Sequence, residues 1–563
     1  MELHMGSLMG SLYVGNSGIV TAQNALNTTA HNLANTDTEG YTRQQVSLGT
    51  RFYITNDKNT HTVAWTQIGL GVTYNECKQV RSTFLDQSYR KEYGRQEFYD
   101  VSKLTLEEIE DQLQEMNGAE FANALANLWT SVQELVKNPT AAVNQSTLVT
   151  RANEFLTQAQ SVYTGLTNYQ SDMDATITTM VKRINDIGDR ISELNQKIVK
   201  IESGNQEHAN DLRDERNVLL DELASYGKIS YQEDIFGNVL CQFEGTQFIM
   251  TDHVNHMAVD KTLESSVGYS TPYWEFASKS YYNSDGEKVV TDISGAKVYD
   301  LTQTVSTQLN TDIGKLRATL LARGDHNATY HDIAESTEYY NSTISQSIIM
   351  NVEAEFDMLV HNIISKINEI YEEAGSNPAN LDPTAGSKTD YDLFTIDDTE
   401  ACIIYDMVKM GGDVIYEAGT FKLGSTIMNT SVNDTYMQTP TTMSFILADG
   451  SEDTETVQKL QAAFEESIYT LNPNVETTSD FLTYYNNLVS QVANSGSIYN
   501  NIYASQEQTV NSVASAREQI VGVSNDEELE FMIEYQNAYN ASSRYINVIS
   551  EMIEHIISQL GNR

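Results

Sequence analysis

The chain has 563 residues and a formal net charge of −44, because 78 Asp and Glu residues outweigh 34 Lys and Arg residues. This acidity excludes nucleic acid as the main partner and disfavours docking on an anionic membrane, since both need clustered cations. The length predicts about three or four domains, and no apolar run approaches the roughly 18 residues of a membrane-spanning helix.

A helix is expected near the N-terminus, and a second one near the C-terminus. The first stripe has apolar or small residues three and four apart: Ile19, Ala22, Leu26, Thr29 and Leu33. The second continues the same spacing further: Tyr539, Ser542, Ile546, Ile549, Ile553, Ile556 and Leu560. Such spacing is typical of coiled-coil seams, and Ser524 or Asn525 is expected to cap the second helix.

The middle of the chain is predicted to be helical in blocks. Helices are expected over 83–114, 177–201, 210–226, 344–370 and 481–520. Between them, 229–305 and about 376–475 carry turn pairs such as Gly237-Asn238 and β-prone runs such as Val239 to Phe243. These two segments are therefore predicted to be hairpin-built β-rich inserts.

The predicted fold is an α+β multidomain chain with a nested order. Residues 1–82 and 522–563 form a terminal domain of paired coiled-coil helices, and 83–228, 306–375 and 476–521 form a helical-bundle domain. The inserts 229–305 and 376–475 are outer β-rich domains that project from it.

Few residues suggest catalysis or a bound ion. His253 and His256 have a spacing that could bind a metal, but a polar turn is the preferred interpretation. The segment from Asn283 to Glu287 lacks the full calcium-loop alternation, and no phosphate-binding or nucleophile motif is present. We expect no catalytic residue, no cofactor and no metal, and hence a protein that is not an enzyme.

The two terminal stripes favour packing of the helices between subunits over a two-helix core formed within one chain. The N-terminal stripe is thin, because Ala22 and Thr29 bury little surface, and chain ends normally fray. A helix of this kind needs a partner to be stable.

The segment from Asn24 to Gln44 resembles the N-terminal signature of flagellar rod, hook and hook-associated proteins. It has a helix, then Asn32-x-x-Asn35, then Gly40-Tyr41, and its continuation through Thr42 and Arg43 resembles the hook-associated protein 1 family at the hook–filament junction. The stretch 525–560 resembles that family's C-terminal helix, and 210–216 resembles part of its helical domain. These matches cover about a fifth of the chain.

The signature residues have a physical rationale. Asn35 is expected to end the helix, because asparagine tolerates left-handed backbone and bonds to its own backbone. Gly40 allows a turn that no side chain would fit, and Tyr41 and Arg43 can anchor the chain as it leaves the helix. The predicted signature motif therefore consists of Asn32, Asn35, Gly40, Tyr41 and Arg43. The predicted self-assembly seam consists of Ile19, Leu26, Leu33 and the C-terminal stripe.

The resemblance implies a structural subunit of the bacterial flagellum, secreted unfolded by the flagellar type III apparatus. Its partners would be further copies in a ring-like zone, the hook protein, and a second junction protein with flagellin on the filament side. An export chaperone is expected at the C-terminal helix, whose Ile-rich seam needs cover before assembly.

Two alternatives remain open from the sequence. A flagellin, hook or rod subunit would share the termini, although flagellins lack the run from Gly40 to Gln44 and hook proteins are mostly β between their ends. An acidic secreted adhesin or enzyme would act through the β inserts.

Overall fold

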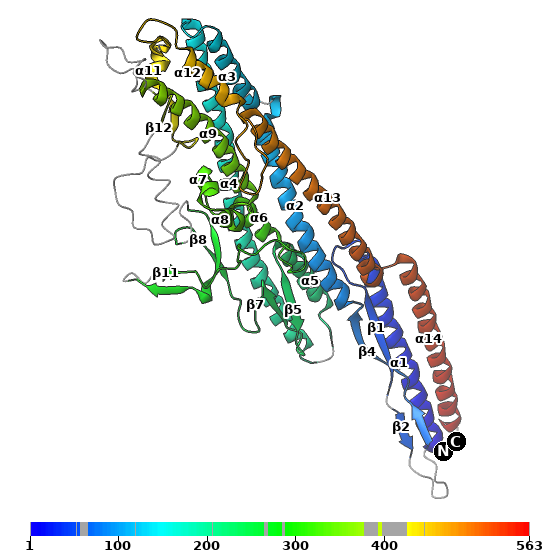
Figure 1. The fold of residues 1–563 in the computed structure, drawn as a ribbon. Coiled ribbons are helices and arrows are strands. Elements are labelled where there is room, and N and C mark those ends of the chain that lie inside the picture. Colours follow the sequence, from blue (N-terminus) through cyan, green and yellow to red (C-terminus); the bar gives the residue numbers. More distant parts are fainter. Residues whose placement is uncertain are drawn as a thin grey trace.

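The structure is a computed structural model, and the molecule is elongated with both chain termini at one end (Figure 1). It describes residues 2–51, 53–56, 66–118, 120–204, 207–263, 268–283, 288–376, 392–396, 425–443 and 445–561. Helices run along the long axis, and part of the β structure projects to one side (Figure 1).

Helices form most of the described chain. The α-helices are α1 (Glu2–Ala34), α2 (Thr83–Gly118), α3 (Glu120–Lys137), α4 (Ala142–Glu202), α5 (Asn210–Tyr226), α6 (Lys315–Arg323), α7 (Tyr330–Glu335), α8 (Thr337–Tyr339), α9 (Ile348–Ser376), α11 (Asp434–Gln438), α12 (Thr454–Glu465), α13 (Phe481–Val521) and α14 (Asn525–Gly561). Short 3-10 or π turns occupy Glu275–Ala277, Tyr340–Ile344 and Pro440–Thr442.

The described strands form small antiparallel sheets. They are β1 (Gln44–Thr50), β2 (Tyr53–Asn56), β3 (Thr66–Gly69), β4 (Val72–Gln79), β5 (Ile229–Glu233), β6 (Val239–Phe243), β7 (Thr246–Ile249), β8 (Met257–Asp260), β9 (Thr271–Trp274), β10 (Lys279–Tyr282), β11 (Lys288–Asp292), β12 (Phe394–Ile396) and β13 (Thr430–Val432). Five two-stranded sheets pair β1 with β4, β2 with β3, β8 with β9, β10 with β11, and β12 with β13, while β5, β6 and β7 form a three-stranded sheet.

Helix α4 is the spine of the middle of the molecule. Its 61 residues span about 90 Å at 1.5 Å per residue. Its first half is buried in one hydrophobic core and its second half in another. One continuous helix therefore fixes the two cores relative to each other.

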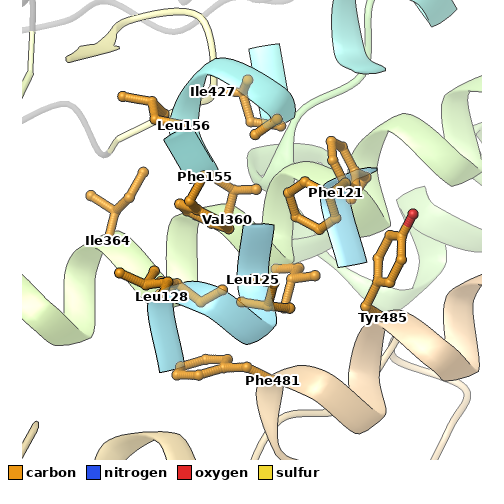
Figure 2. Packing of buried hydrophobic residues seen from close by; sticks show 14 of the residues in the cluster. Phe121, Leu125, Leu128, Phe155, Leu156, Val360, Ile364, Ile427, Phe481 and Tyr485 are labelled. Atoms are coloured by element: carbon orange, nitrogen blue, oxygen red, sulfur yellow. The ribbon is translucent and has the colours of Figure 1, made fainter. Parts of the chain in front are cut away.

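The larger core is all-helical at its centre. Phe155 of α4, Phe356 of α9 and Tyr485 of α13 surround Phe121 of α3, with ring centroids of Phe121 and Phe356 4.8 Å apart. Figure 2 shows the neighbouring aliphatic side chains filling the space between these helices. Four helices distant in sequence are thus held by one apolar cluster.

The second core packs the β5–β6–β7 sheet on α4, α5 and α6. Val239, Cys241 and Phe243 alternate with less buried residues along β6, as expected for a strand with one buried face. At Gly188 of α4, a Cβ atom would lie 2.5 Å from the Phe248 ring, so this glycine lets the sheet approach the helix closely.

The predicted helices 83–114, 177–201, 210–226 and 481–520 are confirmed as parts of α2, α4, α5 and α13, and 344–370 is confirmed from Ile348 onward as α9, because Ile344 ends a separate π turn. The α+β multidomain class is also confirmed, whereas the domain boundaries stay a prediction. Much of the insert 376–475 lies outside the described residues, and its described part contains α11 and α12 besides β12 and β13. Helices in this insert are more prominent than the sequence analysis expects.

Candidate functional site

The two terminal helices lie side by side and antiparallel (Figure 1). Gly15 of α1 lies against Ile546 of α14, and Gly18 lies against Ser542. A Cβ atom on Gly15 would be 2.6 Å from Ile546 Cγ1, and one on Gly18 would be 2.5 Å from Ser542 Oγ. Two glycines therefore set the close spacing of the helix pair.

Small residues, rather than large apolar ones, make the most buried face of α1. They are Ser17, Thr21, Ala22, Ala25 and Thr29. Each buried methylene group stabilises a fold by about 0.8 kcal/mol. Because these side chains have few such groups, they contribute little to the stability of the helix pair.

The predicted seam residues differ in how deeply this contact buries them. In α1, Ile19, Leu26 and Leu33 are half-buried. In α14, Ile549 is buried, whereas Ile546, Ile553 and Ile556 are half-buried and Tyr539 is exposed. The side chain of Leu560 lies outside the described residues.

Asn32 joins the end of α1 to both α14 and the chain that follows. Its Nδ2 donates to Glu528 Oε2 at 3.1 Å and to the Gln44 carbonyl at 2.9 Å. Its Oδ1 accepts the Tyr41 hydroxyl at 2.8 Å and the Gln44 backbone N–H at 3.0 Å. The buried amide is thereby fully hydrogen-bonded, and burial raises the pKa of Tyr41 well above its usual range.

Arg43 completes the connection to the first turn of α14. Its Nε lies 2.9 Å from Glu528 Oε1, and its Nη1 lies 2.9 Å from Glu527 Oε2. The guanidinium also lies over the Phe531 ring, and the Arg43 backbone N–H donates to the Val521 carbonyl. We call Asn32, Tyr41, Arg43 and Glu528 the terminal clasp.

Asn35 and Gly40 shape the turn between α1 and β1. Asn35 follows the last residue of α1, and its Nδ2 donates to the His31 carbonyl at 3.0 Å. The predicted helix end at Asn35 is therefore found with the predicted bond to nearby backbone, but the backbone of Asn35 is not left-handed, so that part of the expectation is wrong. Gly40 does have a positive φ of 77°, which confirms the predicted turn, and a Cβ there would lie 2.2 Å from Val218 of α5.

The clasp is tied to the helical domain through Asp214 of α5. Asp214 accepts the Thr42 backbone N–H at 3.2 Å and Gln79 Nε2 at 2.7 Å. Burial raises the pKa of Asp214 to about 6, although the Thr42 hydrogen bonds and Arg81 act in the opposite direction. The signature loop is therefore held from two sides, by α14 and by α5.

A second apolar stripe of α14 faces away from α1. Its members include Leu529, Ile533, Val548 and Met552, all of them exposed. Ile533 alone leaves 61% of its surface open. The helix pair thus has apolar surface that the chain itself leaves uncovered.

The residues considered for metal binding do not converge. His253 Nδ1 lies 2.8 Å from Asp252, and His256 Nε2 lies 2.9 Å from Asp189 on α4. Among the described residues there is no group of three or more His, Cys, Asp or Glu side chains placed to hold a metal ion. The segment Asn283 to Glu287 lies mostly outside that part of the chain. No described helix has the length and apolar character needed to cross a membrane.

Sequence reasoning missed Glu528 and Asp214 as members of this site. From the sequence, Glu528 is only an acid that suits the helix dipole, and Asp214 belongs to the run 210–216 that carries part of the resemblance. Both are buried carboxylates, a state that the sequence does not reveal because their partners are far away along the chain.

Comparisons with known proteins give two family-model matches and several similar chains. Residues 106–375 match the family model described as the flagellar hook-associated protein FlgK helical domain, and 12–42 match that of the flagella basal body rod protein. Flagellar hook-associated protein 1 of Bacillus subtilis (strain 168) is 26% identical over 560 residues, covering 99% of each chain.

Other similarities cover less of the chain. Flagellar hook-associated protein 1 of Salmonella typhimurium is 26% identical over 208 residues, which is 37% of this chain and 36% of that relative. The solved flagellar hook junction protein FlgK from Burkholderia pseudomallei has a TM-score of 0.37 and 14% identity, covering 56% of this chain and 47% of that one. The chain is thus similar to flagellar hook-associated protein 1 along its whole length, and its residues 106–375 match the helical-domain model of that protein.

Proposed function

We propose that this chain is a structural subunit of the bacterial flagellum and forms the junction zone between hook and filament. The observation that carries the proposal is the similarity to flagellar hook-associated protein 1 over 99% of both chains, from one terminal helix to the other. This full-length match favours the junction role over a flagellin, hook or rod subunit. An adhesin or enzyme acting through the inserts would not require the paired terminal helices.

The terminal helices are the proposed assembly elements. The contact between α1 and α14 within one chain buries mainly small side chains of α1, while the second stripe of α14 stays exposed. Packing that stripe against further copies would bury the exposed leucine, isoleucine, valine and methionine side chains, at about 1.5–3 kcal/mol for each one fully buried. Copies in a ring-like zone would then form a coiled-coil layer around an axial channel, with the helical domain and the inserts outside it.

The proposed partners follow from this position. The chain would contact the hook protein on one side, and a second junction protein and flagellin on the other. It would travel unfolded through the flagellar type III apparatus and end outside the cell. An export chaperone would cover the apolar stripes of α14 before assembly.

Electron microscopy of flagella from a strain lacking this gene tests the proposal. Bare hooks, flagellin shed into the medium, and rescue by the intact chain are the expected result. Complete filaments in the deletion strain would contradict the junction role. Loss of the hook itself would place the chain among hook or rod subunits.

The assembly role of α14 can be tested separately with an Ile533→Asp variant. The side chain is exposed, so the substitution should leave the folded monomer intact while abolishing rescue. The matched control is Gln536→Asp, which adds the same charge at an exposed polar position on the same helix. If Ile533→Asp rescued filaments as well as the control, the exposed stripe would not be an assembly surface.

A further inference from the structure

A pocket lies where α2, the end of α5, β5 and the loop before α6 meet. Its lining includes Gln87, Arg90 and Lys91 of α2, Lys228 and Ser230 at the start of the sheet, and Asn310 of the loop. Its volume is about 310 Å³, far above the roughly 10–15 Å³ that one water needs. It is large enough to admit a side chain together with water.

Backbone contacts keep this pocket from collapsing. At Gly227, which lines it, the backbone lies against Gly314, where a Cβ atom would be 2.4 Å from the Gly227 Cα. The Gly314 backbone N–H donates to the carbonyl of Gly94 on α2 at 2.8 Å. Three glycines thus fix the surrounding elements at close range, and the pocket is preformed.

Positive charge gathers at the pocket. Arg90 is 2% exposed, and its Nε pairs with Asp221 at 2.6 Å. The other oxygen of Asp221 binds Arg517 at 2.7 Å, so this carboxylate is shared between two guanidiniums, and Arg517 also pairs with Asp86 at 2.8 Å. Lys91 is exposed and forms no ion pair with the described part of the chain.

The nearby acids compensate this charge only in part. Lys228 is exposed, and Glu244 accepts its backbone N–H at 2.6 Å. Burial raises the pKa of Glu244 to about 7, which weakens its negative charge at neutral pH. The pocket is therefore a cationic site in a chain whose surface is dominated by carboxylates.

We propose that this pocket receives a carboxylate side chain from a second copy of the same chain. The occupant follows from charge complementarity, because a copy presents many more acidic than basic side chains. It follows also from position, because Arg517 links the pocket to the last turn of α13, directly before the terminal pair. The inference rests on the proposed junction role, which places copies beside one another, and the contact between two different surfaces is of the kind that builds rings.

Photo-crosslinking in assembled flagella tests the contact. A photoreactive amino acid is placed at Ser230, on the rim of the pocket, in a strain that makes no other copy of the protein. A reference chain carries it at Ile533, on the exposed stripe of α14. The expected product at Ser230 is a covalent dimer of twice 63.0 kDa, whose crosslinked peptide contains Asp or Glu. The K91E/K228E double variant should reduce this dimer at least tenfold, whereas K182E, an exposed lysine on α4, should not.

The outcomes separate this proposal from the junction role. A dimer at Ile533 without one at Ser230, a crosslink from Ser230 to another protein, or a Ser230 dimer unaffected by K91E/K228E would overturn the pocket proposal. Citrate binding to the purified chain, lost in K91E/K228E, without any Ser230 dimer would assign the pocket to a free anion and also overturn it. No dimer at either position together with complete filaments would contradict the proposed function itself.

Discussion

Breaking the ion pair between Arg43 and Glu528 should loosen α14 from α1. The Glu528 side chain is 2% exposed and the Arg43 side chain 21% exposed. In Arg43→Ala, the buried carboxylate keeps only the Asn32 amide as a side-chain donor. Breaking a buried pair costs about 3–5 kcal/mol, and the partial exposure of Arg43 places this pair near the lower end, at about 3 kcal/mol.

Hydrogen exchange of the α14 amides measures this loss where it occurs. About 3 kcal/mol corresponds to roughly a hundredfold faster exchange, at 1.36 kcal/mol per tenfold. A local readout is needed because a chain of several domains does not unfold in two states. The amides between Glu528 and Tyr535 should respond most.

The double variant R43A/E528Q separates a lost charge pair from lost packing. Because E528Q replaces the carboxylate by a neutral amide, no unpaired charge stays buried, and the double variant should recover about 1–2 kcal/mol relative to additive single effects. Lys137→Ala is the control, because its pair with Glu134 is exposed on both sides and should contribute at most about 0.5 kcal/mol. Additive effects of R43A and E528Q, or unchanged exchange in R43A, would refute the clasp.

Three further substitutions test the site. Gly15→Leu should force the terminal helices apart, at a cost of about 2 kcal/mol, and should abolish filament rescue. The control Gly10→Leu should still rescue filaments, because the space around the Cβ position of Gly10 is open. Equal rescue by the two variants would show that the close helix contact is unimportant. Gly40→Ala should lower the stability of the fold by about 2–3 kcal/mol, through backbone strain and the contact with Val218. The double variant G40A/V218A should recover only part of this stability. Full recovery would mean that the positive φ carries no strain. The pKa of Asp214 is raised from 3.8 to about 6 in the folded chain. The contribution of Asp214 to folding stability is therefore complete below pH 3.8 and is lost as the pH rises through 6. Local opening free energies, taken from hydrogen exchange of the amides around Thr42 at pH 4 and pH 6.5, should therefore show wild type losing up to about 3 kcal/mol relative to Asp214→Asn, and parallel pH dependences in the two chains would contradict the shift.

The long helices could be predicted because their apolar stripes are regular. The expected range 210–226 coincides with α5, and the cap expected for the C-terminal helix lies at the start of α14. The run Val239 to Phe243 coincides with β6. In each case local periodicity and burial agree, so the sequence carries the signal.

Other elements lack such a signal. Strands β1 and β4 are half-exposed and have no clear alternation of apolar residues. Helix α3 is not among the predicted helices, although it contributes Phe121 to the larger core. Helix α12 lies within a segment whose turn pairs suggest β structure.

The clasp could be predicted only in part. Asn32, Tyr41 and Arg43 are identified by a resemblance, but their partner Glu528 lies 485 residues beyond Arg43. Nothing local distinguishes Glu528 from the exposed acids on either side of it. Such a pairing depends on the tertiary arrangement of α1 and α14.

Cryo-electron microscopy of the hook–filament boundary in intact flagella tests the central claim most directly. The account predicts density for this chain at the boundary, with α1 and α14 innermost around the channel and the exposed stripe of α14 packed on a neighbouring copy. Terminal helices that lie away from the channel, or a boundary built without this chain, would contradict it.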